Sequence, residues 1–370
     1  MNQRIKTIAL CIALSILNTS VAICIENGDR QLDKRAAKKV LREEDPGFFT
    51  TEEAIRIGDQ ILLWQRVTGG WPKNIDMVSP MSKEQIDEVA VEKGRIDDST
   101  TDNDATTLQL TYLARLYKAT GEARFKDAFM KGVEYLLAGQ YENGGWPQFW
   151  PEMHDYQIHI TYNDDAMVNT MTLLRDIASG VSPYDSGICD EILKQRMRKA
   201  FDKGVECILS TQIVVGGIPT VWCQQHDRET LAPAKARSYE LPSYCSQESA
   251  SIVRLLMEIP DPDSRIVKAV DGAMKWFEEN RIRCVSYRRD NSEGKWKVIL
   301  EENPNDDTPV WARYYDLENC FPFVCDRDGV PRRSLEEIGE ERRNGYAWYS
   351  DRPSYLFPIY REWKSKLHNN

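Results

Sequence analysis

The sequence lacks an excess of positive charge, a metal-binding cysteine pattern and a long apolar run beyond its first 22 residues. Its 48 Lys and Arg residues against 58 Asp and Glu give a formal net charge of −10. We therefore expect no nucleic-acid partner, because phosphate binding needs a basic surface. The nine cysteines show no CxxC or zinc spacing, and we expect no membrane-spanning segment.

Also missing are a Ser- or Pro-rich linker and a low-complexity stretch. A chain of 370 residues, 41% of them hydrophobic, is long and apolar enough for a large core. We therefore predict a signal peptide over residues 1–22, an N-terminal segment over 23–44 and a single domain over 45–370. A monomer is the default expectation.

The first 22 residues have the layout of an export signal. Arg4 and Lys6 precede a short apolar run over residues 8–17, and Ser20-Val21-Ala22 fits a small-x-small cleavage site. This pattern predicts a secreted or periplasmic protein. A lipoprotein anchor at Cys24 is the alternative, which the bulky Ile23 before it disfavours.

Internal repeats dominate the middle of the chain. Residues 125–150 and 197–222 align without a gap and are identical at 12 of 26 positions, and residues 51–74 form a weaker copy. Each copy has apolar residues at helical spacing, then Gly-Gly and a Pro that stop the helix. A loop, an acidic start and a second helix follow each turn.

These repeats predict a mainly α fold in which three helix pairs close into an α/α toroid. The Gly-Gly-Trp-Pro turns at 69–72 and 144–147, and Gly-Gly-Ile-Pro at 216–219, would then lie at one rim, with aromatic side chains exposed beside the acidic helix starts. Near the C-terminus, alternation over 284–302 predicts a β-hairpin, and extended additions follow it.

The acidic helix starts are the strongest polar constellation in the sequence. Asp102 and Asp104 flank Asn103 at one start, and Asp164 and Asp165 follow Asn163 at the next. One Asp or Asn per start would satisfy N-capping, so two at each start favour a metal or catalytic role over capping on a solvated face. Carboxylate oxygens of this kind suit Ca²⁺.

A long loop over 223–243 gathers basic side chains in an otherwise acidic protein. Its candidates are His226, Arg228, Lys235 and Arg237. A loop of this length needs a reason to exist, although a surface loop with scattered charge remains the alternative. Lys73 and Arg313 add cations near aromatic residues.

Aromatic residues also gather near the turns, among them Trp146 and Tyr239. Core packing is the default for any one of them. As a group on a rim, they would form platforms on which sugar rings could lie.

The segments TTDNDATT, ENGGWPQFWP, ITYNDDAM and CQQHDRETLAPAKARSYELPS together resemble the pectate lyases of polysaccharide lyase family 10. The match runs in order over most of residues 45–370. It implies an α/α toroid, polygalacturonate as substrate, a requirement for Ca²⁺ and cleavage by β-elimination to 4,5-unsaturated products.

The same resemblance implies roles for particular residues. Arg237 matches the family's catalytic base, and Asp102 and Asp164 match its metal-binding positions, with Asp104 and Asp165 as alternatives one residue away. Since arginine stays protonated in nearly all settings, His226 and Lys235 remain conventional alternatives for the base. We predict substrate contacts at Lys73, His226, Arg228, Lys235, Tyr239, Arg313 and Trp146.

Three rival functions stay open. An α/α-barrel glycoside hydrolase would use Asp102 and Asp164 as its acid and base. A non-catalytic protein would bind acidic sugars through Ca²⁺ and aromatic residues. Toroidal terpene cyclases also have Gly-Trp turns, but export and the lack of an aspartate-rich diphosphate motif argue against that class.

Overall fold

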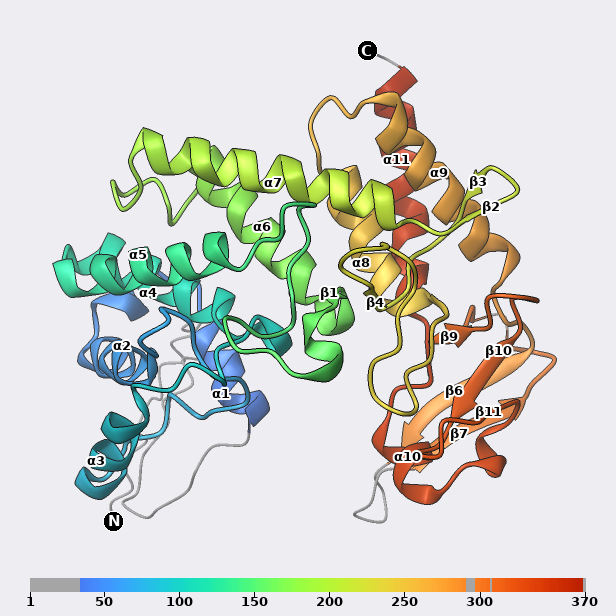
Figure 1. Cartoon of the computed structure of the whole chain (residues 1–370), viewed down its shortest axis with the longest axis horizontal. Helices are drawn as coiled ribbons and strands as arrows, with labels where there is room; N and C mark the ends of the chain where they lie inside the picture. The colour runs from blue at the N-terminus through green and yellow to red at the C-terminus, as the bar shows by residue number, and fades with distance from the viewer. Residues whose placement is uncertain (1–33, 291–296, 307, 369–370) are drawn as a thin grey trace, which may run out of the picture. The chain divides into compact units, whose positions relative to one another are not determined.

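Helices dominate residues 34–290, 297–306 and 308–368, the part of the chain that the computed structural model describes (Figure 1). Contacts group Leu32–Asn370 into one unit. The predicted signal peptide lies outside the described residues. None of the described helices combines the length and apolar character that a bilayer crossing requires.

The described α-helices include the six that the repeats predict, which are α2, α4, α5, α6, α7 and α8. Neighbours along the chain pack together, α4 on α5, α6 on α7 and α8 on α9 (Figure 1). Their bounds are α1 (Lys34–Leu41), α2 (Glu52–Trp64), α3 (Lys83–Glu92), α4 (Thr107–Thr120), α5 (Ala123–Ala138), α6 (Ala166–Ser179), α7 (Glu191–Thr211), α8 (Ser246–Met257), α9 (Ser264–Glu279), α10 (Glu340–Gly345) and α11 (Leu356–His368).

Amphipathic patterning explains these helices. In α5, Phe125, Phe129 and Val133 recur at helical spacing and are fully buried. The N-cap residue Asp190 accepts a hydrogen bond from the backbone N of Leu193 at 2.7 Å, which starts α7. The prediction of a mainly helical core is therefore confirmed.

A repeated glutamine joins each unit to the next. The side-chain amide of Gln65, at the end of α2, donates to Gly69 O in its own turn and to Ala128 O in α5, both at 2.8 Å. Gln140 and Gln212 make the matching pairs of bonds, and the second bond of Gln212 ends on Ala269 O in α9. The series α2, α5 and α7 therefore continues into α9, a fourth member that the sequence repeats do not reveal.

The tryptophans of the turns are structural. The indole N–H groups of Trp71, Trp146 and Trp222 donate to carbonyls of the preceding helices at 2.7–2.8 Å. Their rings are at most 2% exposed. The prediction of exposed aromatic platforms is therefore wrong for these three residues, because the indole side chains fill the core instead.

The same tryptophans place the acidic helix starts. Their backbone oxygens accept hydrogen bonds at 2.8–3.1 Å from Thr100 and Thr161, two positions before Asp102 and Asn163, and from Cys245, which directly precedes α8 and its Glu248. Each turn therefore links the end of one helix to the beginning of the next. This link explains why one chain repeats a turn that is costly to order.

The third turn departs from the predicted pattern. Gly216 and Gly217 form the tip of an exposed hairpin between β2 (Val214–Val215) and β3 (Ile218–Pro219). Trp222 takes the structural place of Trp146, although the sequence alignment pairs it with Trp150. The alignment therefore holds for the helix but not for the turn, because the hairpin adds residues before the tryptophan.

Short antiparallel strands complete the described fold. The predicted C-terminal hairpin is confirmed by β6 (Val285–Asp290) and β7 (Lys297–Glu302), and its turn lies outside the described residues. The other pairings are β1 (Ile160–Thr161) with β4 (Gln225–His226), β8 (Trp311–Ala312) with β12 (Tyr349–Ser350), and the order β11 (Pro331–Arg332), β10 (Pro322–Cys325), β9 (Tyr314–Tyr315), β5 (Tyr244–Cys245).

These strands bring the C-terminal region to the start of α8, the third helix start with an acidic residue. The backbone N of Ser246, the first residue of α8, donates to Arg313 O at 3.0 Å. Arg313 lies between β8 and β9, so the pairing of β9 with β5 fixes its side chain beside α8.

Candidate active site

Two acidic turns of matching shape form the centre of the site. They are the 3-10 turns η2 (Asp102–Asp104) and η4 (Asn163–Asp165), which contact each other. The last two residues of each have positive φ, from 50° to 65°, a region that Asn and Asp tolerate better than other non-glycine residues. Side-chain caps are absent at the described starts of η2, α4, η4 and α6, so capping does not explain the aspartates.

Asp102 has a buried carboxylate, and only one of its two oxygens accepts hydrogen bonds from the described residues. Its side chain is 2% exposed, and its Oδ2 accepts hydrogen bonds from Lys73 Nζ and from Gln148 Nε2, the latter at 2.9 Å. Its Oδ1 is buried and has no hydrogen-bond partner among the described residues. A buried oxygen without a partner is costly, so this atom is suited to a bound cation or donor.

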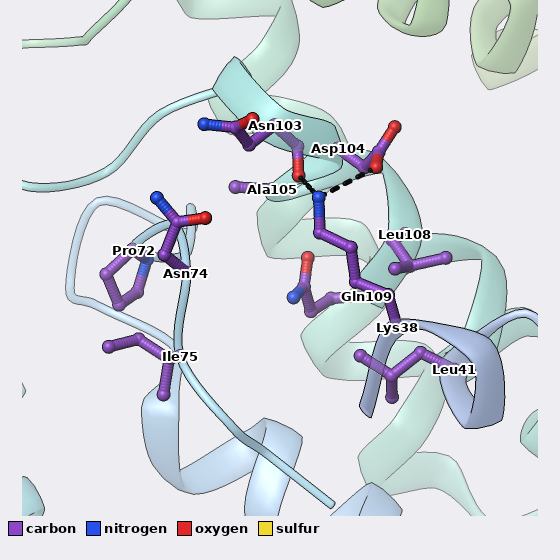
Figure 2. Close-up of a pocket in the computed structure, with 10 residues that line it drawn as sticks. All are labelled: Lys38, Leu41, Pro72, Asn74, Ile75, Asn103, Asp104, Ala105, Leu108 and Gln109. Carbon is purple, nitrogen blue, oxygen red and sulfur yellow. Dashed lines mark hydrogen bonds and ion pairs between the residues drawn. The ribbon is translucent and has the colours of Figure 1, made fainter. Parts of the chain in front are cut away.

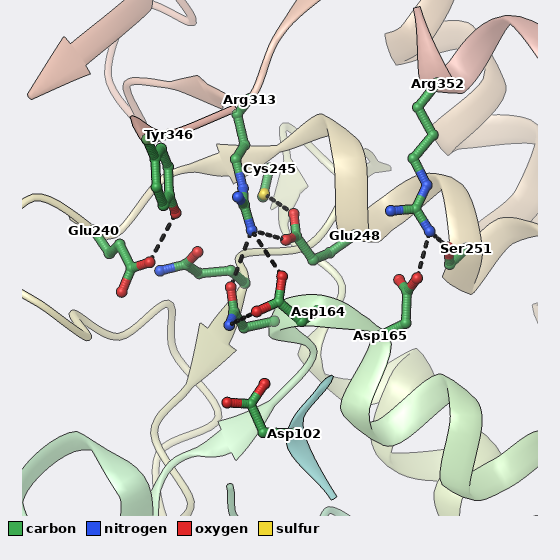
Figure 3. A network of polar contacts seen from close by, with 12 residues as sticks. Asp102, Asp164, Asp165, Glu240, Cys245, Glu248, Ser251, Arg313, Tyr346 and Arg352 are labelled. Carbon is green, nitrogen blue, oxygen red and sulfur yellow. Dashed lines mark hydrogen bonds and ion pairs between the residues drawn. The ribbon is translucent and has the colours of Figure 1, made fainter. Parts of the chain in front are cut away.

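Asp164 faces a ring of charged groups (Figure 3). Its Oδ2 accepts a hydrogen bond from Asn163 Nδ2 at 3.0 Å, and its Oδ1 lies 3.8 Å from Arg313 Nη2. Burial raises the pKa of Asp164 to about 6; Arg313 and Arg237 oppose this shift, and the negative charges of Asp102 and Glu248 add to it. The charges of Asp102, Arg237 and Arg313 therefore all influence the Asp164 carboxylate.

Asp104 and Asp165, the last residues of the two turns, point to other partners. Asp104 Oδ2 pairs with Lys38 Nζ at 3.1 Å and with Arg42 Nη2 at 2.7 Å. Asp165 pairs with Arg352 (Figure 3). These two carboxylates therefore pair with cations near the two ends of the described chain, whereas Asp102 pairs with Lys73 and Asp164 lies beside Arg313.

Arg237 is held at the edge of the site by a buried glutamate. Its Nε donates to Glu240 Oε2 at 2.7 Å and its Nη2 donates to Glu240 Oε1, whereas Nη1 makes no hydrogen bond within the described residues. Burial lowers the pKa of the Arg237 guanidinium, but Glu240 outweighs it and holds that pKa above its usual value. Tyr346 Oη donates to Glu240 Oε1 at 2.7 Å and stiffens the pair.

Arginines gather around two tyrosines beside Arg237. The guanidinium carbon of Arg237 lies 5.1 Å from the ring centre of Tyr239 and 5.8 Å from that of Tyr346. Arg313 lies 4.8 Å from the Tyr346 ring, and Arg327 and Arg342 lie within 6 Å of the Tyr239 ring. Each of these arginines also pairs with a glutamate, so the cluster is a charged network packed on two buried tyrosine rings.

His226 belongs to the core rather than to the site. It is fully buried, its Nε2 accepts from Cys223 N at 3.0 Å and its Nδ1 donates to Leu231 O at 2.9 Å. Burial lowers the pKa of His226 to about 4. The prediction of a substrate contact at His226 is therefore wrong, and so is its alternative use as a base, because both ring nitrogens hold the loop together.

Three further predicted contacts lie away from the centre. Trp146 is buried and offers no face to a ligand. Arg228 lies 6.0 Å from the ring centre of Tyr141, and Lys235 is exposed. No contact among the described residues joins the side chain of either one to the acidic turns.

The sequence analysis missed several residues of the site. Glu248 occupies the same position after the tryptophan link as Asp164, and both carboxylates face Arg313. This repeat position was a signal that could have found Glu248. No comparable signal marked Glu240, Tyr346 or Tyr156. Burial raises the pKa of Tyr156, and the charges of Arg237, Glu240 and Asp102 also influence that pKa.

The chemistry of the acidic turns fits a calcium ion, although the turns alone do not complete a site. No three His, Cys, Asp or Glu side chains in the described ranges come close enough together to hold a metal. Asp102 Oδ1 is buried without a partner, and Asp164 is a second hard oxygen donor beside it. Calcium takes about six to eight oxygen ligands, so water or a ligand carboxylate would supply the remainder.

Comparisons with known proteins identify relatives of the whole chain. A family model described as pectic acid lyase matches residues 65–357. A mutant of a family 10 polysaccharide lyase from Cellvibrio cellulosa, solved in complex with trigalacturonic acid, is 28% identical with a TM-score of 0.76, over 90% of this chain and 99% of that one. Another structure of a family 10 polysaccharide lyase from Cellvibrio cellulosa is 31% identical with a TM-score of 0.76, over 90% and 97%. No curated protein matches the chain.

Together, the helical fold, the acidic turns and these matches define an enzyme of the polysaccharide lyase class. The chain belongs to the pectic acid lyase family, polysaccharide lyase family 10. The resemblance carried by the four sequence motifs is thereby confirmed.

Proposed function

We propose that this enzyme cleaves α-1,4-linked polygalacturonate by Ca²⁺-dependent β-elimination and releases 4,5-unsaturated oligogalacturonides. One observation carries the proposal: Asp102 and Asp164, from two separate turns, act on each other beside Arg237, and one Asp102 oxygen is buried without a partner. The trigalacturonic acid in the related structure supports the substrate class.

Substrate binding needs positive charge, because each sugar of the polymer carries a carboxylate. Arg237 and Arg313 flank Asp164, and Lys73 lies on the other side against Asp102. We assign uronate binding to Arg237 and Lys73, whose side chains are partly exposed, with Arg313 as a buried cation behind Asp164. The sugar contact predicted at Tyr239 is wrong, because its ring is buried like that of Trp146. Calcium between Asp102 and Asp164 would reconcile a protein of net charge −10 with an acidic polymer.

The reaction removes the proton on C5 of a uronate and breaks the bond between C4 and the glycosidic oxygen. When bound, calcium supplies positive charge opposite the uronate carboxylate, where negative charge develops. Asp102 and Asp164 would hold that ion, and Arg313 adds a fixed cation beside Asp164. As a neutral guanidine, Arg237 would accept the C5 proton at Nη1, the nitrogen that forms no bond to the described protein, while the leaving glycosidic oxygen takes a proton from water.

The resting contacts of Arg237 oppose this role, since Glu240 favours the guanidinium cation. Two changes on substrate binding would lower the pKa of the Arg237 guanidinium. A calcium ion nearby repels the cation, and the bound polymer removes water from around it. Glu240 keeps the planar group oriented through Nε and Nη2 while Nη1 faces the sugar.

Further expectations from the sequence belong to the same proposal. They are closure of the helix pairs into an α/α toroid, a single catalytic domain over residues 45–370, export to the periplasm or beyond the cell, and a monomeric state. The fourth helix of the series, α9, and the helix-to-helix glutamine bonds support continued packing of pairs around one axis.

A spectrophotometric assay on polygalacturonate, with and without a chelator, tests the proposal. β-Elimination creates a conjugated double bond that absorbs ultraviolet light, so we expect absorbance to rise with calcium and to stop rising with chelator. Release of reducing ends without absorbance would contradict the lyase mechanism. Unchanged rates in excess chelator would contradict the calcium requirement.

A hydrolase mechanism is the second candidate, and one observation favours it. The pKa of Asp164 is raised to about 6, as in a general acid, and Asp102 beside it would be the second carboxylate. Family membership and the bonds of Lys73 and Gln148 to Asp102 argue against this mechanism. The same absorbance assay separates the two, because hydrolysis forms no double bond.

A further inference from the structure

The last residue of the first acidic turn is held by basic side chains from α1. Lys38 Nζ donates to Asn103 O at 2.7 Å and to Asp104 Oδ2 at 3.1 Å (Figure 2). Arg42 Nη2 donates to the same carboxylate oxygen at 2.7 Å. We call this group, Lys38, Arg42 and Asp104, the first clamp.

The second acidic turn is held in the same way from the other end of the described chain. Arg352 Nη2, at the start of η6 (Arg352–Tyr355), donates to Asp165 Oδ2 and to Ser251 Oγ, the latter at 2.6 Å (Figure 3). Ser251 lies in α8, so this contact joins η4, η6 and α8. We call Arg352, Ser251 and Asp165 the second clamp.

A hydrogen bond also ties the first turn to the helix that follows the second turn. Asn169 Nδ2 donates to Asp104 Oδ1 at 3.1 Å. Asn169 lies in the first turn of α6, the helix that begins directly after Asp165. The first clamp therefore fixes the first turn relative to the helix that the second turn starts.

The turns need such contacts because their backbone is strained. Asn103 and Asp104 are consecutive left-handed residues, and so are Asp164 and Asp165. Such conformations persist only where surrounding contacts over-determine them, and they cluster at functional sites. The cavity beside Lys38 is about 20 Å³, which holds about one water molecule, so the first clamp is a packing device rather than a second sugar site.

We propose that the two clamps position the carboxylates of Asp102 and Asp164 toward one calcium ion. The proposal rests on the proposed function. Asp104 and Asp165 are positioning residues, since each joins its turn to a distant part of the chain and shares that turn with a residue that faces the site. The clamps should therefore set calcium affinity and not the chemical step.

Two charge-removing variants test the clamps, Arg352→Gln alone and Lys38→Gln with Arg42→Gln. Outer contacts of this kind typically change metal affinity by about tenfold or more. We expect the calcium concentration for half-maximal cleavage to rise about tenfold, while kcat at saturating calcium stays within about twofold of wild type. Arg352→Lys, which keeps the charge, should recover most of the calcium affinity.

Binding of trigalacturonate, measured by calorimetry at fixed calcium, is a readout independent of turnover. We expect weaker binding by the variants at low calcium and recovery when calcium is raised. Arg196→Gln is the matched control, because it removes an equally close arginine–glutamate pair between α7 and α5. Its calcium dependence should equal that of wild type.

The outcomes separate the two proposals. If wild type needs no calcium, the proposed function fails. If wild type needs calcium but the clamp variants share its calcium dependence, or lose kcat alone, the clamps fail. Should Arg352→Gln not fold, Ser251→Ala removes only one contact of Arg352; an unchanged calcium dependence in that variant would overturn the second clamp.

Discussion

The two acidic turns have the same backbone but use it differently. In the first turn the residue that faces the site is Asp102, the first position, and it is buried with Lys73 and Gln148. In the second it is Asp164, the second position, which is 37% exposed beside Arg313. The third position, Asp104 or Asp165, pairs in both turns with a cation from near one end of the described chain.

This difference shows how three repeated helix starts form one asymmetric site. The tryptophan links place three helix starts at equivalent points, but a single ion with one substrate needs different groups from each. The first start supplies a buried carboxylate, the second a half-exposed one, and the third supplies Glu248, which binds Arg313. The internal repeats supply equivalent positions at the helix starts, and the side chains at those positions differ from one start to the next.

The largest expected effect comes from the group that lies beside both turns. Arg237→Ala and Arg237→Lys should each lower kcat about a thousandfold, because general-base catalysis contributes about 10² to 10⁴. Steady-state rates on polygalacturonate measure this loss, with trigalacturonate binding as the control for folding. Retention of most activity in Arg237→Ala would remove Arg237 from the mechanism.

Removal of either carboxylate tests whether the two turns bind the same ion. Asp102→Asn and Asp164→Asn should each weaken calcium binding by about a hundredfold, and the double variant should lose far less than the product of the two. Calcium titration in the presence of trigalacturonate measures these affinities. Asp185→Asn, which removes a surface carboxylate paired with Lys118, is the control. Strictly additive losses would mean that the turns bind separate ions.

The raised pKa of Asp164 makes the second turn sensitive to pH. Burial raises this pKa from 3.8 to about 6, so a proton competes with calcium below about pH 6. We expect calcium binding about tenfold weaker at pH 5 than above pH 7, and Asp164→Asn should lose this dependence. A wild-type affinity that is flat between pH 5 and 7 would show that Asp164 does not bind the ion.

The same shift has a consequence for stability without calcium. Since the folded state holds the Asp164 proton more tightly than the unfolded state, the free energy of unfolding should fall as pH rises from 3.8 to about 6. Thermal melting in chelator across this range, with Asp164→Asn as the comparison, checks the sign.

The smallest effect on catalysis is expected at a residue that follows both turns in sequence and lies outside the site. His226→Gln should leave kcat within about twofold and lower the free energy of unfolding by about 1–3 kcal/mol, because buried backbone groups lose their partners. Steady-state activity measures the change in kcat, and chemical denaturation measures the change in the free energy of unfolding. A large loss of kcat with unchanged stability would restore His226 as a candidate base.

Much of the fold was predictable because the repeats are local. Apolar spacing and the Gly-Gly breaks predicted six helices correctly, and the alternation over 284–302 predicted the C-terminal hairpin. The structural place of Trp222 was not predictable, because an inserted hairpin shifts it relative to the glycines. The burial of the tryptophans also escaped prediction, since sequence does not tell a rim from a core when both follow a turn.

The site was less predictable than the fold because its partners come from distant parts of the chain. The resemblance supplied Asp102, Asp164 and Arg237 as proposals, but the choice between neighbouring aspartates depends on Lys38 and Arg352, which lie at opposite ends of the described residues. No local spacing encodes such pairs.

A crystal structure with calcium and trigalacturonate tests the central claim most directly. The account predicts one ion at about 2.3–2.6 Å from an oxygen of Asp102 and an oxygen of Asp164, with Nη1 of Arg237 facing C5 of the sugar. An ion bound at Asp104 or Asp165, or bound to one turn alone, would contradict it.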